Sequence, residues 1–169
     1  MTIALTGFMG SGKTTVGRAL AARLGWDFVD LDEAIEKAMG RTVPQIFESE
    51  GEQAFRKMET EVLERVLGDS TGNLVLALGG GTLLSERNRA LARKHCLCVW
   101  LRASADELQR RLSGQAAGRP LLAGPDPALR IRSLLSEREP IYLEAADITL
   151  QADGLSPQDA AQLMEKEIK

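Results

Sequence analysis

The segment that decides the fold is Gly7-Phe8-Met9-Gly10-Ser11-Gly12-Lys13-Thr14. It matches the pattern G-x-x-x-x-G-K-[ST], and it lies between an apolar run at 3–5 and a stretch of helical period through Val16, Leu20 and Leu24. Glycines let several backbone N–H groups converge on phosphate oxygens, and the start of a helix adds partial positive charge there. The segment therefore predicts a nucleotide-binding loop.

Individual residues of this phosphate loop have separate predicted tasks. We expect Lys13 to be an exposed cation that reaches the β- and γ-phosphates of ATP, and Thr14 to ligate Mg²⁺. The expected nucleotide contacts are Gly10, Ser11, Gly12, Lys13, Thr14 and Thr15. The alternative is a glycine-rich turn with a surface lysine, but at about 7% background glycine a chance match is below roughly one in a hundred.

Short apolar runs alternate with segments of helical period along the rest of the chain. Five runs are interpreted as strands, at 3–5, 28–29, 74–78, 96–101 and 148–150. Most of them are continuous rather than alternating, which favours a parallel sheet covered by helices on both faces. The predicted class is α/β, with the P-loop NTPase architecture.

Three segments between or after these strands have predicted roles of their own. The region 31–67 is expected to be helical, interrupted at Gly40, Pro44 and Gly51, and to form a flap over a substrate. The segment 113–127, rich in glycine and proline, is expected to be a mobile lid. Pro157 is expected to open a last amphipathic helix.

Composition restricts the class of protein further. A chain of 169 residues with 44% hydrophobic content predicts one domain with a buried core. A net charge of −3 and a pI near 5.3 argue against a nucleic-acid partner. No apolar run approaches the roughly 20 residues that span a bilayer, and no signal peptide is visible. We expect a cytoplasmic monomer, with Cys96 and Cys98 as reduced core residues on one strand.

Asp30 and Asp32 follow the second predicted strand, at the end where open α/β sheets bind their ligands. One carboxylate can hold Mg²⁺ through water, while the other can accept a hydrogen bond or proton from an attacking hydroxyl. The alternative interpretation is that Asp32 caps the next helix, with Glu33 in its first turn. The neighbouring phosphate loop favours the functional interpretation.

An ordered set of motifs covers nearly the whole chain, and through it the sequence resembles the shikimate kinases. The motifs lie at 7–18 (GFMGSGKTTVGR), 30–32 (DLD), 46–47 (IF), 51–56 (GEQAFR), 78–81 (LGGG), 118–122 (GRPLL) and 138–142 (REPIY). The resemblance implies transfer of the γ-phosphoryl group of ATP to the 3-hydroxyl of shikimate. It also implies a nucleoside-monophosphate-kinase-like fold, with a five-stranded parallel sheet, a substrate-binding helical region at about 31–67 and a lid.

The resemblance implies roles for the residues on the acceptor side. Asp32 is expected near the ring hydroxyls, and Arg56 and Arg138 near the carboxylate, because guanidinium forks match carboxylates. The run Gly79, Gly80 and Gly81 is expected to present its backbone to the substrate. From spacing alone, Arg56 is also interpretable as a solvated helix residue near acidic neighbours, and the glycines as a tight turn.

On the nucleotide side, the same resemblance implies that Thr14 and Asp30 serve Mg²⁺. It places Lys13 and Arg119 at the transferring phosphate and Arg111 near adenine. The expected catalytic residues are therefore Lys13, Asp32 and Arg119, with Asp32 as the orienter of the acceptor hydroxyl and a candidate base for its proton.

Several alternatives stay open at this point. Phe47 and Phe55 suit a core as well as a surface beneath a ring acid, and we leave them outside the predicted site. A kinase for another small hydroxy acid, such as gluconate, would share the loop and the charge pattern. A module that binds ATP without catalysis would share the loop alone.

Overall fold

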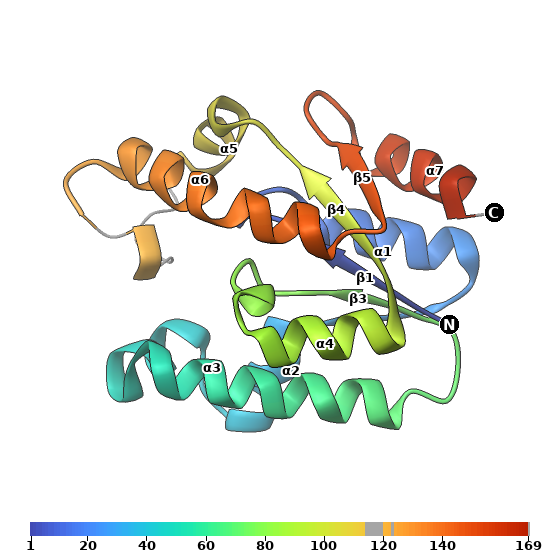
Figure 1. Ribbon diagram of the computed structural model, residues 1–169, viewed down its shortest axis with the longest axis horizontal. Coiled ribbons are helices and arrows are strands. Elements are labelled where there is room, and N and C mark those ends of the chain that lie inside the picture. Colours follow the sequence, from blue (N-terminus) through green and yellow to red (C-terminus); the bar gives the residue numbers. More distant parts are fainter. Residues whose placement is uncertain (114–119, 123, 169) are drawn as a thin grey trace.

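The computed structural model describes residues 1–113, 120–122 and 124–168, and its centre is one five-stranded parallel sheet (Figure 1). The strand order is β2-β3-β1-β4-β5. The strands are β1 (Thr2–Thr6), β2 (Asp27–Asp30), β3 (Leu74–Ala77), β4 (Cys96–Arg102) and β5 (Ile148–Gln151). Each falls on a predicted apolar run, so the predicted parallel α/β sheet is confirmed.

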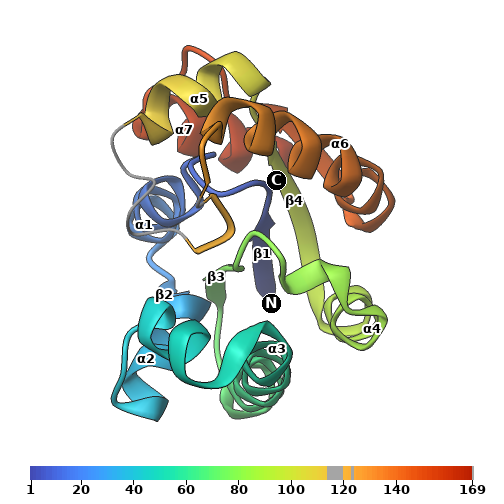
Figure 2. The same cartoon turned by 90° about the vertical axis from the view of Figure 1, so that its left-hand side faces the viewer.

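Helices cover both faces of the sheet, which explains why the central strands β1 and β3 are buried along their whole length. The helices are α1 (Lys13–Leu24), α2 (Leu31–Met39), α3 (Val43–Asp69), α4 (Glu86–His95), α5 (Ala105–Leu112), α6 (Pro127–Ala145) and α7 (Pro157–Ile168). Two short 3₁₀ turns are η1 (Thr82–Leu84) and η3 (Pro120–Leu122). Helices α1 and α7 pack on one face, and α3, α4 and α6 lie on the other (Figure 2).

The order of the strands creates a crevice at the carboxyl ends of the neighbouring strands β1 and β3. Strand β1 leads through the phosphate loop into α1 on one face, whereas its neighbour β3 leads through 79–81 into η1 and α4 on the other. Neighbouring strands whose connections diverge in this way leave a ligand-binding opening at their carboxyl ends. The phosphate loop and the glycine run therefore lie next to each other at this opening.

The helical region predicted for 31–67 is present as α2 and α3. Helix α2 ends at Gly40, which has the left-handed φ of 66° that favours glycine. Pro44 lies in the first turn of α3 rather than at a break, and Thr42 caps that turn together with Gln45. Gly51, with φ 83° and ψ 173°, is a kink inside α3. This kink separates the first two turns from the long C-terminal part of the helix.

The remaining expectations are met to different degrees. The predicted last helix starts at Pro157 as expected. Cys96 and Cys98 are free thiols that contact the same apolar cluster, and burial raises their pKa values to about 12 and about 11. No helix in the described part of the chain is long and apolar enough to cross a membrane. Part of the predicted lid, 114–119 and 123, lies outside the described residues.

Candidate active site

Two adjoining cavities open at the crevice. The first, here called the loop pocket, has a volume of about 510 Å³ and is lined by the phosphate loop from Met9 to Val16, by Arg111 and by residues near β5 and α7. The second, the helix pocket, has a volume of about 250 Å³ and is lined chiefly by α2, α3 and the glycine run. The residues that line both are Met9, Asp32, Gly79 and Gly80. A group bound in one pocket therefore lies next to a group bound in the other.

Lys13 is the first residue of α1 and lines the loop pocket. Its Nζ donates to the carbonyl oxygens of Gly7 at 2.8 Å and Phe8 at 2.9 Å. The side chain folds back over its own loop, so only 9% of the residue is exposed. The expectation of an exposed cation is therefore wrong, because the curved loop offers carbonyl oxygens that satisfy a buried ammonium group.

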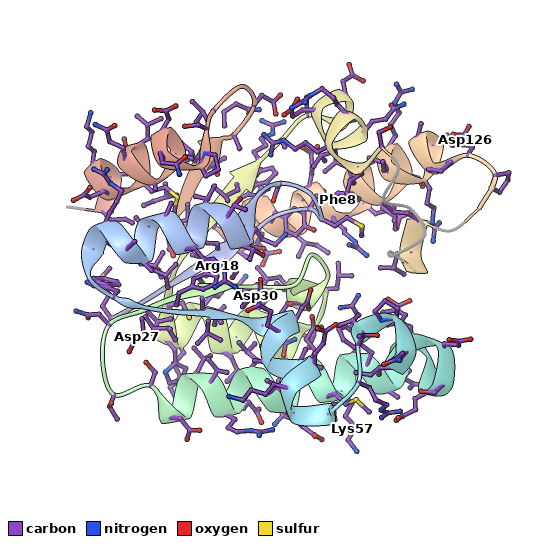
Figure 3. The ribbon with its side chains drawn as sticks, turned by 180° about the vertical axis from the view of Figure 1, so that it is seen from behind. Phe8, Arg18, Asp27, Asp30, Lys57 and Asp126 are labelled. Atoms are coloured by element: carbon purple, nitrogen blue, oxygen red, sulfur yellow. The ribbon has the colours of Figure 1, made fainter. Side chains whose placement is uncertain are left out.

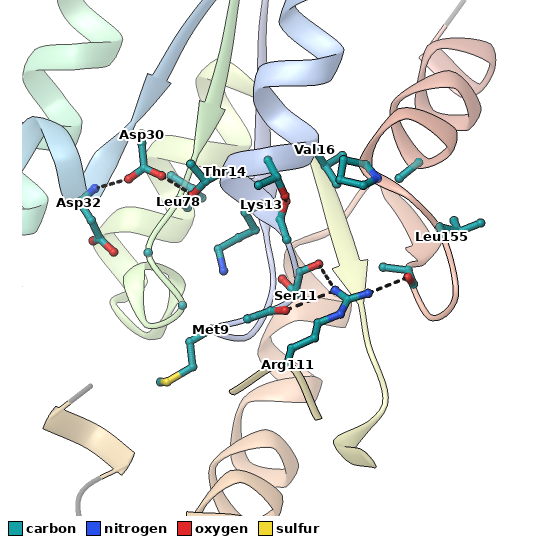
Figure 4. Close-up of a pocket in the computed structure, with 18 of the residues that line it drawn as sticks. Met9, Ser11, Lys13, Thr14, Val16, Asp30, Asp32, Leu78, Arg111 and Leu155 are labelled. Carbon is teal, nitrogen blue, oxygen red and sulfur yellow. Dashed lines mark hydrogen bonds between the residues drawn. The ribbon is translucent and has the colours of Figure 1, made fainter. Parts of the chain in front are cut away.

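Asp30 connects the phosphate loop to the start of α2. Thr14 Oγ1 donates to Asp30 Oδ2 at 2.6 Å, and Asp30 Oδ1 accepts from the backbone nitrogens of Asp32 at 3.0 Å and Glu33 at 3.2 Å (Figure 4). Asp30 is thus the N-cap of α2. The alternative interpretation that Asp32 caps this helix is wrong, since Asp32 lies in the first turn and its side chain lines both cavities.

The carboxyl group of Asp32 has a raised pKa. Burial raises its pKa to about 6, and the Asp30 and Glu59 carboxylates act in the same direction. Lys13 and Arg56 act in the opposite direction without cancelling the rise. A carboxylate that titrates just below neutral pH, at the junction of two cavities, is suited to accept a hydrogen bond or a proton from a bound hydroxyl.

Arg56 reaches the helix pocket from α3. Its Nη1 donates to Glu59 Oε2 at 2.9 Å and its Nη2 donates to Glu52 Oε1 at 3.3 Å. The acidic neighbours expected from spacing are therefore present, but the side chain is only 22% exposed and lines the cavity. Glu59 itself is fully buried. Arg56 is thus held in the site by the buried Glu59 and, at the rim, by the exposed Glu52, rather than solvated on a helix surface.

Arg138 approaches the helix pocket from α6, on the opposite side of the cavity from α3. It is 3% exposed, its Nη1 donates to the Gly80 carbonyl at 3.3 Å, and its guanidinium carbon lies 5.7 Å from the centroid of the Phe8 ring. Figure 3 shows Phe8 on the phosphate loop, where the loop passes α6. Tyr142, one turn further along α6, donates its hydroxyl to the same Gly80 carbonyl.

The glycine run is both a tight turn and a lining of the pockets, so its two interpretations hold together. A Cβ on Gly80 would lie 3.1 Å from the backbone nitrogen of Met9. A Cβ on Gly81 would lie 2.3 Å from Arg56 Nη2. Only residues without side chains allow the phosphate loop and the Arg56 guanidinium to approach this closely.

Two aromatic rings omitted from the predicted site also line the helix pocket. Phe47 and Phe55 lie on either side of the Gly51 kink, with ring centroids 4.8 Å apart and planes tilted by 43°. Their position was not evident from the sequence, because the kink changes which residues of α3 face the cavity. Glu59 and Tyr142 are two further residues of this region that the sequence analysis did not select.

Arg111 on α5 lies at the loop pocket, as Figure 4 shows. It donates to the carbonyl oxygens of Ser11 at 3.1 Å, Gly10 at 3.3 Å and Ala152 at 3.2 Å. Thr15 Oγ1 donates to the Gly12 carbonyl at 3.0 Å at the exposed rim. Arg119, by contrast, lies outside the described residues, so its expected place at the transferring phosphate stays a prediction.

The parallel sheet with a phosphate loop at its switch point, and an adjoining second cavity, define the class: a P-loop kinase. A deoxyadenosine kinase from M. mycoides, 12% identical, shares the fold with a TM-score of 0.62 over 99% of each chain. The family model described as shikimate kinase matches residues 9–169. The chain belongs to the shikimate kinase family.

Individual relatives agree with this assignment. A shikimate kinase of Symbiobacterium thermophilum is 47% identical over 168 residues, covering 98% of this chain and 95% of its own. One of Bordetella avium is 46% identical over 153 residues, covering 90% of this chain and 72% of its own. The solved structure of an Acinetobacter baumannii shikimate kinase in complex with shikimate is 40% identical, with a TM-score of 0.94, and the match covers 99% of this chain and 92% of that one.

Proposed function

We propose that the protein transfers the γ-phosphoryl group of ATP to the 3-hydroxyl of shikimate. The observation that carries this proposal is the junction of two cavities at Asp32, one lined by a phosphate loop and the other by two arginines from different helices. A cavity of about 250 Å³ with two guanidinium groups suits a small carboxylic acid. The Acinetobacter baumannii relative was solved with shikimate bound.

On the donor side, the backbone from Gly10 to Thr15 and the start of α1 are proposed to hold the phosphates of ATP. Lys13 exchanges the Gly7 and Phe8 carbonyls for phosphate oxygens when ATP enters. Its positive charge then counters the charge that develops on the transferring group. Arg111 is proposed to lie near adenine, since it borders the same cavity as Leu155 and Pro157.

The donor set at Thr14 and Asp30 fits Mg²⁺. The hydroxyl and carboxylate oxygens lie 2.6 Å apart, and both are hard ligands of the kind this ion takes. Within the described ranges no group of three or more His, Cys, Asp or Glu could hold a metal, which agrees with an ion that keeps water and phosphate as most of its ligands. When bound, the ion supplies positive charge to the β- and γ-phosphate oxygens.

On the acceptor side, Arg56 and Arg138 are proposed to bind the carboxylate of shikimate, and Asp32 its ring hydroxyls. The backbone of Gly79, Gly80 and Gly81 lines the same cavity and is proposed to contact the ring. Asp32 then orients the 3-hydroxyl toward the loop pocket, and its raised pKa makes it a better proton acceptor than an ordinary aspartate. Arg119 and the lid at 113–127 are proposed to act at the phosphate.

An ADP-release assay with shikimate as acceptor tests the proposal. Parallel reactions contain gluconate or no acceptor, and direct nucleotide titration confirms that the protein binds ATP. Shikimate-dependent ADP formation supports the proposal, whereas gluconate-dependent formation supports the rival hydroxy-acid kinase. Nucleotide binding without acceptor-dependent ADP would identify a binding module. We further propose a cytoplasmic monomer without nucleic-acid or membrane partners, and light scattering tests the oligomeric state.

A further inference from the structure

Thr82 follows the glycine run directly and is fully buried at the start of η1. Its backbone N–H donates to the Gly79 carbonyl at 3.1 Å, and its carbonyl accepts from Asn88 Nδ2 at 2.9 Å. Asn88 is itself fully buried. Two hydrogen bonds between buried groups therefore fix the position of the Thr82 backbone, from which its hydroxyl projects.

That hydroxyl is directed at a buried carboxylate. Thr82 Oγ1 donates to Glu59 Oε1 at 2.6 Å, while the other oxygen, Glu59 Oε2, accepts from Arg56 Nη1 at 2.9 Å. Glu59 is fully buried and divides its two oxygens between a hydroxyl on one side and a guanidinium on the other. The two hydrogen bonds together set the rotation of the carboxylate plane.

The oxygen that Thr82 binds is also the one near the second acid of the site. A Cβ on Gly79 would lie 2.9 Å from Glu59 Oε1, 3.0 Å from Thr82 Oγ1 and 3.1 Å from Asp32 Oδ1. Glu59 and Asp32 thus approach each other at Gly79, where their charges repel. A hydroxyl donor at this point stabilises the negative charge of Glu59 on the side that faces Asp32.

We propose that Thr82 is a positioning residue for the carboxylate of the acceptor. Its hydroxyl orients Glu59, and Glu59 in turn holds the Arg56 guanidinium against Gly81, facing the helix pocket. Thr82 is not among the described residues that line this cavity, so it acts through Glu59 and Arg56 rather than on the substrate. The inference rests on the proposed function, because it takes Arg56 as a contact of the shikimate carboxylate.

The central test variant is Thr82→Val, which keeps the branched shape and removes the hydroxyl. Without the hydroxyl donor, Glu59 Oε1 has lost its hydrogen-bond partner, and the carboxylate can rotate toward Arg56. The Arg56 guanidinium, which is bonded to this carboxylate, then loses its fixed orientation. The shikimate KM and the dissociation constant for shikimate from direct titration should both rise roughly threefold to tenfold. This change corresponds to the free energy of one ordinary hydrogen bond. The ATP KM and kcat should stay within about twofold.

Two further variants separate positioning from structure. Thr82→Ser retains the hydroxyl and should restore shikimate affinity to within about twofold of the unmutated protein. Thr60→Val removes a hydroxyl from the same helix, where Thr60 Oγ1 donates to the Arg56 backbone carbonyl at 3.1 Å, and should leave affinity unchanged. If Thr82→Val does not fold, Thr82→Ala is compared with Thr82→Ser in the same way.

A double-mutant cycle with Arg56→Met decides whether the effect passes through Arg56. In the Arg56→Met background, Thr82→Val should weaken shikimate binding by less than about twofold, since the group it positions is gone. If the effects of Thr82→Val and Arg56→Met on shikimate binding are additive, or if Thr82→Val binds shikimate normally, the inference about Thr82 is overturned and the proposed function is not affected. Failure of the unmutated protein to bind shikimate in the initial titration would overturn the proposed function and the inference with it.

Discussion

The two cavities of the site are built in different ways. The loop pocket takes most of its polar groups from one continuous segment, the backbone and side chains of 10–15, with Asp30, Asp32, Arg110 and Arg111 as distant contributions. The helix pocket takes Asp32 from α2, Arg56 from α3 and Arg138 from α6, and the glycine run after β3 joins them. The comparison shows that one fold can combine a local phosphate site with an acceptor site assembled from distant segments.

The cavities also differ in how their cations are held. In the loop pocket, Lys13 donates to two neutral carbonyl oxygens, which phosphate oxygens can replace. In the helix pocket, Arg56 is bonded to Glu59 and Glu52, so its position is fixed by charge before a ligand arrives. Lys13 can therefore follow the phosphoryl group as it is transferred. Arg56, which is held in place, suits recognition of a carboxylate that does not move during the reaction.

The largest expected effect is that of Lys13→Met. Turnover should fall roughly a hundredfold to a thousandfold, because a positive charge at the transferring phosphate is lost. Shikimate affinity should be unchanged, since Lys13 does not line the helix pocket. Single-turnover kinetics and shikimate titration measure the two quantities. Turnover near that of the unmutated protein would contradict the proposed role of the loop pocket.

Asp32→Asn probes the junction between the cavities. Turnover should fall roughly a hundredfold, since the amide cannot accept the proton and orients the hydroxyl less well. ATP affinity should change little, because the variant alters the acceptor side. The matched variant Asp30→Asn removes the charge beside Thr14 instead and should raise the Mg²⁺ concentration needed for half-maximal rate. Loss of ATP affinity in Asp32→Asn would place Asp32 on the metal side.

Local patterns in the sequence were sufficient to predict the sheet and the loop pocket. Strands β1, β3 and β4 contain continuous apolar runs. The phosphate loop is one segment between a strand and a helix, so neighbours in sequence are neighbours in space. In the helix pocket, Asp32 followed from its place after a strand, whereas Arg56 and Arg138 were reached only through the family resemblance. The hydrogen bonds of this pocket join residues far apart, such as Thr82 to Glu59 across 23 positions and Tyr142 to Gly80 across 62.

The wrong expectation for Lys13 and the wrong alternative for Asp32 have the same cause, a competing hydrogen bond. Lys13 looked exposed, but the carbonyls of its own curved loop bind it in a buried position. The alternative interpretation of Asp32 as a cap is wrong because Asp30, two residues earlier, already accepts the first N–H groups of α2. Helix α6 also continues through Pro140, which brings Tyr142 to the Gly80 carbonyl. Such outcomes depend on three-dimensional partners that propensity does not contain.

Arg138→Ala tests whether the helix pocket recognises a carboxylate. Loss of one charge-assisted contact of about 1.5 to 3 kcal/mol should weaken shikimate binding roughly tenfold to a hundredfold. The control is Arg132→Ala on the same helix, where the side chain is 61% exposed and pairs with Asp106 at 3.6 Å. That variant should bind shikimate normally by titration calorimetry. Unchanged binding by Arg138→Ala would mean that the carboxylate is held elsewhere.

The smallest expected effect is on the free energy of unfolding, because the buried Asp32 carboxylate between the cavities destabilises the fold. Its pKa of about 6 lies above the ordinary value of 3.8, chiefly because of burial, so folding favours the protonated acid. The folded state is therefore destabilised as pH rises from about 4 through about 6, where the unfolded chain releases this proton first. Asp32→Asn removes that penalty and should raise the free energy of unfolding by about 1–2 kcal/mol at pH 7.5.

At pH 4 the gain from Asp32→Asn should shrink to less than about 0.5 kcal/mol, because the carboxyl is then largely protonated in the folded state and partly so in the unfolded chain. Urea unfolding at both pH values measures the difference, with Glu61→Gln, an exposed carboxylate on α3, as the control that should show no such pH dependence. A variant less stable than the unmutated protein at pH 7.5 would mean that attraction of Asp32 to Lys13 and Arg56 outweighs burial and repulsion. A gain in stability together with the loss of turnover would instead show that the acid at the junction is retained for catalysis at the expense of the fold.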